Sequence, residues 1–151
     1  MPWSSRAHGR IVGAFVHVLV LCAAALPAHA GPQLDYTLNC MGCHGADGLG
    51  APPEIPRLKD RMGYYLDVAG GRSYLVQVPG ARQSALSDDA LAGVLNWMLD
   101  RFAGASKPAQ FAPYAAQEVA ALRATPPNDI AAVRRDLERA IVALHPRGYS
   151  D

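Results

Sequence analysis

Residues 33–50 read QLDYTLNCMGCHGADGLG and are the most informative part of this chain. Two cysteines, Cys40 and Cys43, stand three positions apart, and His44 follows the second one directly. The residues before them, 33–39, carry two leucines four positions apart and predict a short helix. The residues after His44 are rich in glycine and proline, which predicts a loop. We therefore expect a short helix that brings two thiols and one imidazole to the start of a loop.

The spacing Cys-x-x-Cys-His is the one by which haem is attached covalently to a polypeptide. Two thiols one turn of chain apart can each add to a vinyl group on the same edge of one porphyrin, and the next residue then points an imidazole toward the iron. We expect Cys40 and Cys43 to bind haem c covalently and His44 to be an iron ligand. The motif occurs once in the chain, so a single haem is expected.

Two other interpretations of these residues are weaker. A thioredoxin-like redox pair needs a strand–helix–strand setting, whereas a glycine- and proline-rich loop follows this pair. A zinc site needs four ligands, and the mature chain offers Cys40, Cys43, His44 and His145. The neighbours Cys43 and His44 would then have to bind the same ion, which is an awkward geometry.

The first 30 residues predict a secretory signal peptide that is cleaved after Ala30. A start with two arginines is followed by an apolar run over 11–26, and Ala28 and Ala30 fit a signal peptidase site. The run is short for a membrane span, which needs about 20 apolar residues, although an uncleaved anchor stays open as an alternative. We therefore expect export to the periplasm, with membrane contact only through the export signal.

Length and composition exclude several classes of function. The 151 residues suit one domain, and loss of residues 1–30 changes the formal net charge from +1 to −1. Nucleic-acid binding is not expected, because it needs a strongly basic face. The two cysteines that remain are too close in sequence to staple a long loop, so the protein is no disulfide scaffold. We expect no enzyme, since paired carboxylates, a nucleophile motif and a phosphate-binding glycine loop are missing.

Residues 87–102 give the clearest helical pattern. Ser87 can cap the helix, and two acidic residues follow where the helix dipole favours negative charge. One apolar stripe at helical spacing needs a surface to pack on. The stripe consists of Leu91, Val94, Leu95, Met98, Leu99 and Phe102.

The other expected elements are shorter or more ambiguous. A second short helix is predicted over 58–68, while 73–78 is ambiguous between strand and helix. Two further helices, over 114–124 and 130–144, form a helical C-terminal extension that spans 105–151. The sequence leaves open whether this extension wraps the domain or docks on a partner.

Over residues 33–102 the chain resembles the class I cytochromes c. The resemblance rests on the helix that ends in CMGCHGADGLG, the proline-bearing loop after it, and the stretch LSDDALAGVLNWML. It implies an all-α fold, with a cytochrome c-like haem domain over 31–104 and the helical extension after it. It also implies one covalently bound haem c.

In that family the first and last helices of the haem domain cross. The resemblance implies that two residues of the first helix lie near three of the last, namely Tyr36 and Leu38 near Leu91, Val94 and Trp97. It further implies that a prolyl carbonyl accepts the ring N–H of His44, which fixes the tautomer and raises ligand basicity. The candidates are Pro52, Pro53 and Pro56.

The sixth iron ligand is where the chain departs from the family pattern. The family usually offers a methionine shortly before the last haem-domain helix, whereas this chain has VPG at 78–80. The remaining candidates are Met62, Met98 and His145, and a five-coordinate iron stays open. A thioether opposite histidine raises the reduction potential and suits electron transfer, while an open position admits small ligands.

We therefore expect a periplasmic monohaem carrier that passes single electrons between redox partner proteins, such as a dehydrogenase or an oxidase. The alternatives are a haem protein that binds or senses small ligands at an open iron, and a subunit tethered to a dehydrogenase through 109–144. Five basic residues of the middle segment are candidates either for contacts with haem propionates or for a solvated surface. They are Arg57, Lys59, Arg61, Arg72 and Arg82.

Overall fold

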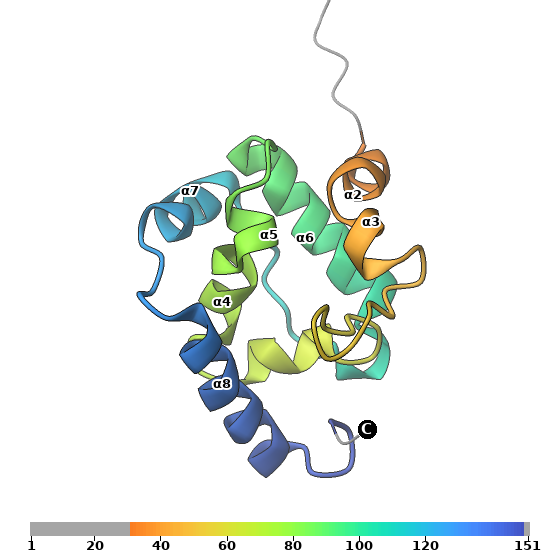
Figure 1. The fold of residues 1–151 in the computed structure, drawn as a ribbon, viewed down its shortest axis with the longest axis vertical. Coiled ribbons are helices and arrows are strands. Elements are labelled where there is room, and N and C mark those ends of the chain that lie inside the picture. Colours follow the sequence, from red (N-terminus) through yellow and green to blue (C-terminus); the bar gives the residue numbers. More distant parts are fainter. Residues whose placement is uncertain (1–30, 150–151) are drawn as a thin grey trace, which may run out of the picture.

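The structure is a computed structural model, and it describes residues 31–149. Every regular element in that span is helical, apart from an isolated bridge between Ala51 and Ile55, so the all-α prediction is confirmed. The predicted signal peptide lies outside the described residues. The elements in chain order (Figure 1) are α2 (Pro32–Asn39), α3 (Met41–His44), η1 (Met62–Asp67), α4 (Gly71–Gln77), α5 (Pro79–Arg82), α6 (Asp88–Phe102), η2 (Gly104–Ser106), α7 (Ala116–Ala124) and α8 (Ile130–Leu144).

Helix α6 crosses the middle of the molecule (Figure 1) and contributes more buried core residues than any other described element. The Ser87 hydroxyl accepts a hydrogen bond from the Ala90 N–H at 3.2 Å, as the capping prediction requires. Each residue of the predicted apolar stripe is buried. Burial of one large apolar side chain contributes about 1.5–3 kcal/mol, so this face is a main source of stability.

Helix α2 packs across α6 through one aromatic residue. The Tyr36 ring is 2% exposed, and its centroid lies 5.1 Å from that of Trp97 and 5.2 Å from that of Phe102. Leu38, which we expected to lie there too, is 71% exposed, so that expectation is wrong. At 100° per residue, Leu38 points about 200° away from Tyr36 around the helix, and only one of the two can face α6.

The helix predicted over 58–68 forms only in part. Asp60 adopts a left-handed backbone conformation with φ of 59°, which interrupts any helix there, and the 3₁₀ helix η1 begins at Met62. The Asp60 N–H donates to the carbonyl of Phe102 at 2.8 Å. This turn is therefore tied to the end of α6 rather than to a longer helix.

The ambiguous segment 73–78 is helical and belongs to α4. The helix stops before Pro79, because the residue before a proline prefers an extended backbone, and Val78 has ψ of 143°. At its other end, a Cβ on Gly71 would collide with the carbonyl of Tyr65. Glycine at this position lets α4 approach η1 closely.

The C-terminal extension folds back onto the rest of the chain. Helix α7 packs on α6 and α4, and α8 packs on α4 and η1 (Figure 1). Its buried side chains join the same core as the α6 stripe; they are Tyr114, Val119, Leu137 and Ile141. In the described part of the chain, no helix is long and apolar enough to cross a membrane.

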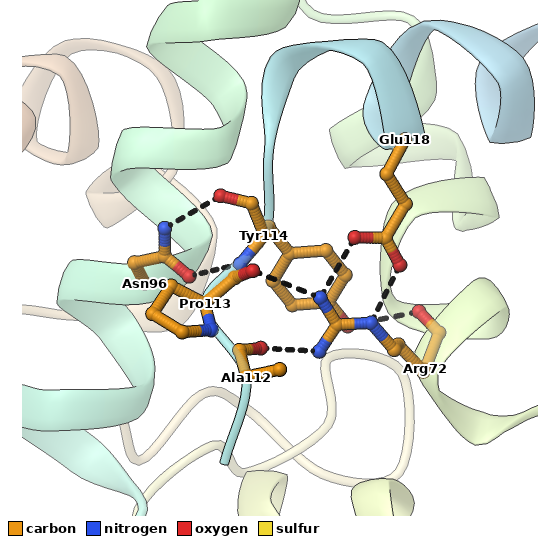
Figure 2. A network of polar contacts seen from close by, with 6 residues as sticks. All are labelled: Arg72, Asn96, Ala112, Pro113, Tyr114 and Glu118. Atoms are coloured by element: carbon orange, nitrogen blue, oxygen red, sulfur yellow. Dashed lines mark hydrogen bonds and ion pairs between the residues drawn. The ribbon is translucent and has the colours of Figure 1, made fainter.

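Arg72 of α4 makes the polar contacts that hold this extension against the rest of the chain (Figure 2). Its guanidinium binds both carboxylate oxygens of Glu118, at 2.5 and 2.7 Å, and lies 4.0 Å above the ring of Tyr114. It also donates to the carbonyls of Ala112 and Pro113. Arg72 therefore serves the extension, and this engagement argues against its role as a propionate ligand.

Asn96 fixes the same segment to α6 (Figure 2). Its side-chain amide donates to the Tyr114 carbonyl at 3.0 Å and accepts from the Tyr114 N–H at 2.7 Å. The side-chain amide thereby satisfies both backbone hydrogen-bonding groups of Tyr114, which lies outside any helix. The chain between α6 and α7 is thereby held in one register.

Candidate haem-binding site

The attachment motif consists of Cys40 and the single helical turn α3 that follows it. Cys40 precedes this turn and is half-buried, whereas Cys43 lies within it and is exposed; both are free thiols. Burial, and then the negative charge of Asp35, raise the pKa of the Cys40 thiol. The turn places both thiols and the imidazole of His44 close together on one short element.

His44 is oriented by a backbone carbonyl. Its Nδ1 lies 3.2 Å from the Pro56 carbonyl oxygen, which confirms the expected prolyl contact and selects Pro56 among the three candidates. Burial lowers the pKa of His44. A neutral ring that donates from Nδ1 leaves the lone pair of Nε2 for a metal ion.

The loop that carries Pro56 depends on two glycines with positive φ. A Cβ on Gly48 would lie 2.8 Å from the Phe102 ring, and a Cβ on Gly50 would lie 2.6 Å from the Ile55 carbonyl. The Gly50 N–H donates to the carbonyl of His44 at 3.0 Å. The glycine-rich sequence after the motif therefore lets the loop fold back under the histidine.

The candidates for a sixth iron ligand do not share one environment. Met62 and Met98 are both buried in the core, at 2% and 7% exposure. His145 has its Nε2 2.9 Å from a carboxylate oxygen of Asp67, and its ring lies against that of Tyr64, with centroids 4.5 Å apart and planes tilted by 34°. His145 is therefore engaged with η1. Among residues 31–149 no group of three or more His, Cys, Asp or Glu side chains that could hold a metal ion is assembled.

A cavity of about 1070 Å³ lies between α8 and the loop that carries Pro56. Five arginines line it, from both sides: Arg57, Arg61, Arg134, Arg135 and Arg139. Their ion pairs with carboxylates include Arg57–Asp60, Arg134–Glu138 and Arg139–Asp136. Of the described acidic residues, only Glu138 is part of the lining, so positive charge is in excess there. A porphyrin with two carboxylates fits this chemistry.

Two of these arginines, Arg57 and Arg61, are among the basic candidates of the sequence, whereas the three on α8 are not. The charged run in 134–139 carries no local signal for a site, because its relevance depends on where α8 lies. Of the other basic candidates, Lys59 and Arg82 do not line the cavity.

Glu138 closes one side of the cavity. Its Oε1 accepts hydrogen bonds from the hydroxyls of Tyr65 and Tyr149 and from Nε of Arg134, at 3.2, 3.3 and 2.7 Å. Burial raises the pKa of both tyrosines, so they stay protonated donors at neutral pH. The cluster ties α8 to η1 at the cavity wall.

The fold and the site together define a class of protein. A helical chain presents two thiols and a neutral, carbonyl-bound imidazole within five residues. The residue whose carbonyl binds the imidazole, Pro56, also lines the arginine-rich cavity, whereas the motif residues themselves do not. These are the features of a small all-α protein that holds a porphyrin through covalent attachment.

Comparison with known proteins gives the family. A family model described as "Cytochrome c" matches residues 28–124, and this chain belongs to the cytochrome c family, whose members bind haem c covalently. It is 31% identical over 119 residues to a protein named "Cytochrome c-552" from Thermus thermophilus, with 66% of this chain and 91% of that protein covered. A second protein of that name, from a particular strain of the same species, shows the same identity, with 80% of its length covered. The family resemblance and the prediction of haem c are thereby confirmed.

Proposed function

We propose that this member of a family of haem electron carriers is a monohaem carrier that works in the periplasm. The observation that carries the proposal is the turn of α3, where the Nδ1 of His44 meets the Pro56 carbonyl at 3.2 Å beside two free thiols. Cys40 and Cys43 would form the two thioether bonds, and His44 would bind the iron through Nε2.

When bound, the haem supplies one-electron chemistry at its iron. The residues of this chain position it and set its surroundings. Pro56 holds the His44 ring in the tautomer that can bind metal, and it makes the ring more electron-rich. Cys43 is exposed, so the attached edge of the porphyrin would lie at the protein surface, where a partner can approach.

We assign the arginine-lined cavity to the haem carboxylates. Arg134 and Arg135 reach it from α8, and Arg61 reaches it from the opposite side. Guanidinium groups pair with carboxylates through two parallel hydrogen bonds, which fixes their orientation as well as their charge. The C-terminal extension would then complete the haem site.

We propose the domain organisation and location that the sequence suggests. Residues 1–30 act as a signal peptide, 31–104 form the haem domain, and 105–151 form the extension. The carrier would meet redox partners, such as a dehydrogenase or an oxidase, in weak and brief contacts with small interfaces. We propose that the protein is not an enzyme.

The test is expression in cells that mature c-type cytochromes. The reduced, purified protein should show the spectrum of covalently bound haem, and Cys40→Ala or Cys43→Ala should remove one covalent bond each. Cys22→Ser is the matched control, because Cys22 lies in the predicted signal peptide and should leave haem attachment unchanged. Haem that dissociates from the unaltered protein under denaturing conditions would refute the proposal.

A second candidate function is small-ligand binding at an open iron position. It is favoured by the segment 78–87, VPGARQSALS, which holds no methionine or histidine where the family usually offers its ligand. The engagement of His145 with Asp67 points the same way. Titration of the reduced protein with carbon monoxide distinguishes the two functions. Rapid, tight binding supports the open site, and a spectrum that carbon monoxide leaves unchanged supports the six-coordinate carrier.

A further inference from the structure

The segment 78–87 joins α4 to α6, and we call it the distal segment. The family resemblance places the ligand opposite His44 in this stretch, so an iron–ligand bond would normally anchor it. Here it contains no side chain that binds iron. The segment includes the short helix α5 and has proline, glycine, alanine or serine at six of its ten positions. It needs another anchor to keep one conformation.

Arg123, near the end of α7, reaches into the distal segment. One terminal nitrogen donates to the Leu86 carbonyl and to Asp88, both at 2.8 Å. The other donates to the carbonyl and the hydroxyl of Ser84, at 3.0 and 3.1 Å, and to the Ala81 carbonyl at 3.4 Å. The Arg123 side chain is only 17% exposed. One cation thereby satisfies three backbone carbonyls of the distal segment.

Gln77 ties the other end of the segment to the same turn of α7. Its side-chain amide donates to the carbonyls of Thr125, at 2.8 Å, and Leu122, at 3.3 Å. Helix α7 itself is anchored in the core by Val119, which is fully buried. Both flanks of the distal segment are therefore bound to one well-fixed turn.

We propose that the last turn of α7 takes over the anchoring of the distal segment from an iron–ligand bond, and that Arg123 is the positioning residue that controls access to the iron face opposite His44. This inference rests on the proposed function, because it places the haem at the motif of α3.

The contact pattern argues for positioning rather than for a simple ion pair. Asp88 supplies one of the five acceptor atoms, and the other four belong to the distal segment. A planar guanidinium can serve several fixed carbonyls at once, whereas a lysine presents a single ammonium. Loss of the cation would leave the Ser84 and Leu86 carbonyls without this donor, whereas the Ala81 carbonyl would keep its bonds from the Ser84 hydroxyl and N–H. The half-buried segment would then be held less firmly against α7.

The test uses the full-length, haem-loaded protein with Arg123→Gln, Arg123→Lys and Asp88→Asn. The control is Arg101→Gln, which removes an exposed arginine of α6. Two quantities are measured: amide hydrogen exchange of residues 81–88, and the association rate of carbon monoxide with the reduced protein. We expect exchange in Arg123→Gln to rise at least about tenfold over the control, and the association rate to rise with it. For Arg123→Lys, the exchange rate and the association rate should lie between those of the control and of Arg123→Gln. Asp88→Asn should change both rates less than Arg123→Gln does.

Two results would overturn the inference. One is exchange in Arg123→Gln that matches Arg101→Gln. The other is exchange that rises while carbon monoxide associates at an unchanged rate, because Arg123 would then be merely structural. If Arg123→Gln does not fold, Gln77→Ala gives the same two readouts with one anchor removed. A haemless protein would refute the proposed function instead, and exchange of 81–88 would still report on the anchor.

Discussion

Truncation of Tyr36 to alanine tests how α2, the helix that leads into the attachment motif, is held on the fold. The ring is almost fully buried between Trp97 and Phe102. Its hydroxyl donates to the Gly45 carbonyl at 2.6 Å, directly after the motif. No other residue of α2 is buried, so the packing of α2 on the rest of the fold depends mainly on this side chain.

The expected loss can be worked out from these contacts. Removal of a large buried aromatic side chain costs about 3–5 kcal/mol through lost transfer energy and the cavity that remains. The hydrogen bond to Gly45 adds about 1 kcal/mol. We expect Tyr36→Ala to lower the free energy of unfolding by about 5 kcal/mol, and Tyr36→Phe by about 1 kcal/mol.

Guanidinium unfolding followed by far-ultraviolet circular dichroism measures the effect. Leu38→Ala is the matched control on the same helix, and its exposure of 71% predicts a change within about 0.5 kcal/mol. If Tyr36→Ala and Leu38→Ala lose the same stability, the crossing of α2 and α6 is not held by this ring, and our account of the fold fails.

Three further predictions concern the extension and the cavity. Glu118→Gln should lower the free energy of unfolding by about 1 kcal/mol at neutral pH. Because Arg72 lowers the pKa of Glu118, this stabilisation is present above the ordinary pKa of 4.5 and is lost as the pH falls through the lower pKa of the folded state. If the stabilities of Glu118→Gln and the unaltered protein do not converge in acid, the prediction is contradicted. Arg135→Gln should lower the midpoint potential of the haem relative to Arg101→Gln, since it removes positive charge that favours the reduced state; equal potentials in a redox titration would refute the assignment of the cavity. Ending the chain after Phe102 removes the buried side chains of Tyr114, Val119, Leu137 and Ile141, each worth about 1.5–3 kcal/mol, so thermal unfolding should show a large loss; a truncated protein with unchanged melting temperature would contradict this.

Local patterns in the sequence predicted the parts of this structure that depend on local chemistry. The motif at Cys40, Cys43 and His44 needs only one turn of chain, and the stripe over 87–102 follows from helical spacing alone. The buried stripe is confirmed, and haem attachment at Cys40, Cys43 and His44 stays a prediction. The contact of His44 with Pro56 came from the family resemblance, because the loop between them has no regular pattern.

The misses depend on contacts between distant parts of the chain. The apolar spacing in 58–68 could not reveal the left-handed Asp60, whose N–H is bound to the end of α6. Leu38 has the hydrophobicity of a core residue, but its position on the helix turns it to solvent. The arginines of α8 became site candidates only when that helix was found beside the loop of Pro56.

The most direct measurement is the intact mass of the protein purified from cells that mature c-type cytochromes, followed by mass mapping of its peptides. Our account predicts that a single haem mass stays on the polypeptide in acid, on the peptide that contains Cys40 and Cys43. A polypeptide of apoprotein mass, or haem found on a peptide that lacks both cysteines, would contradict the central claim.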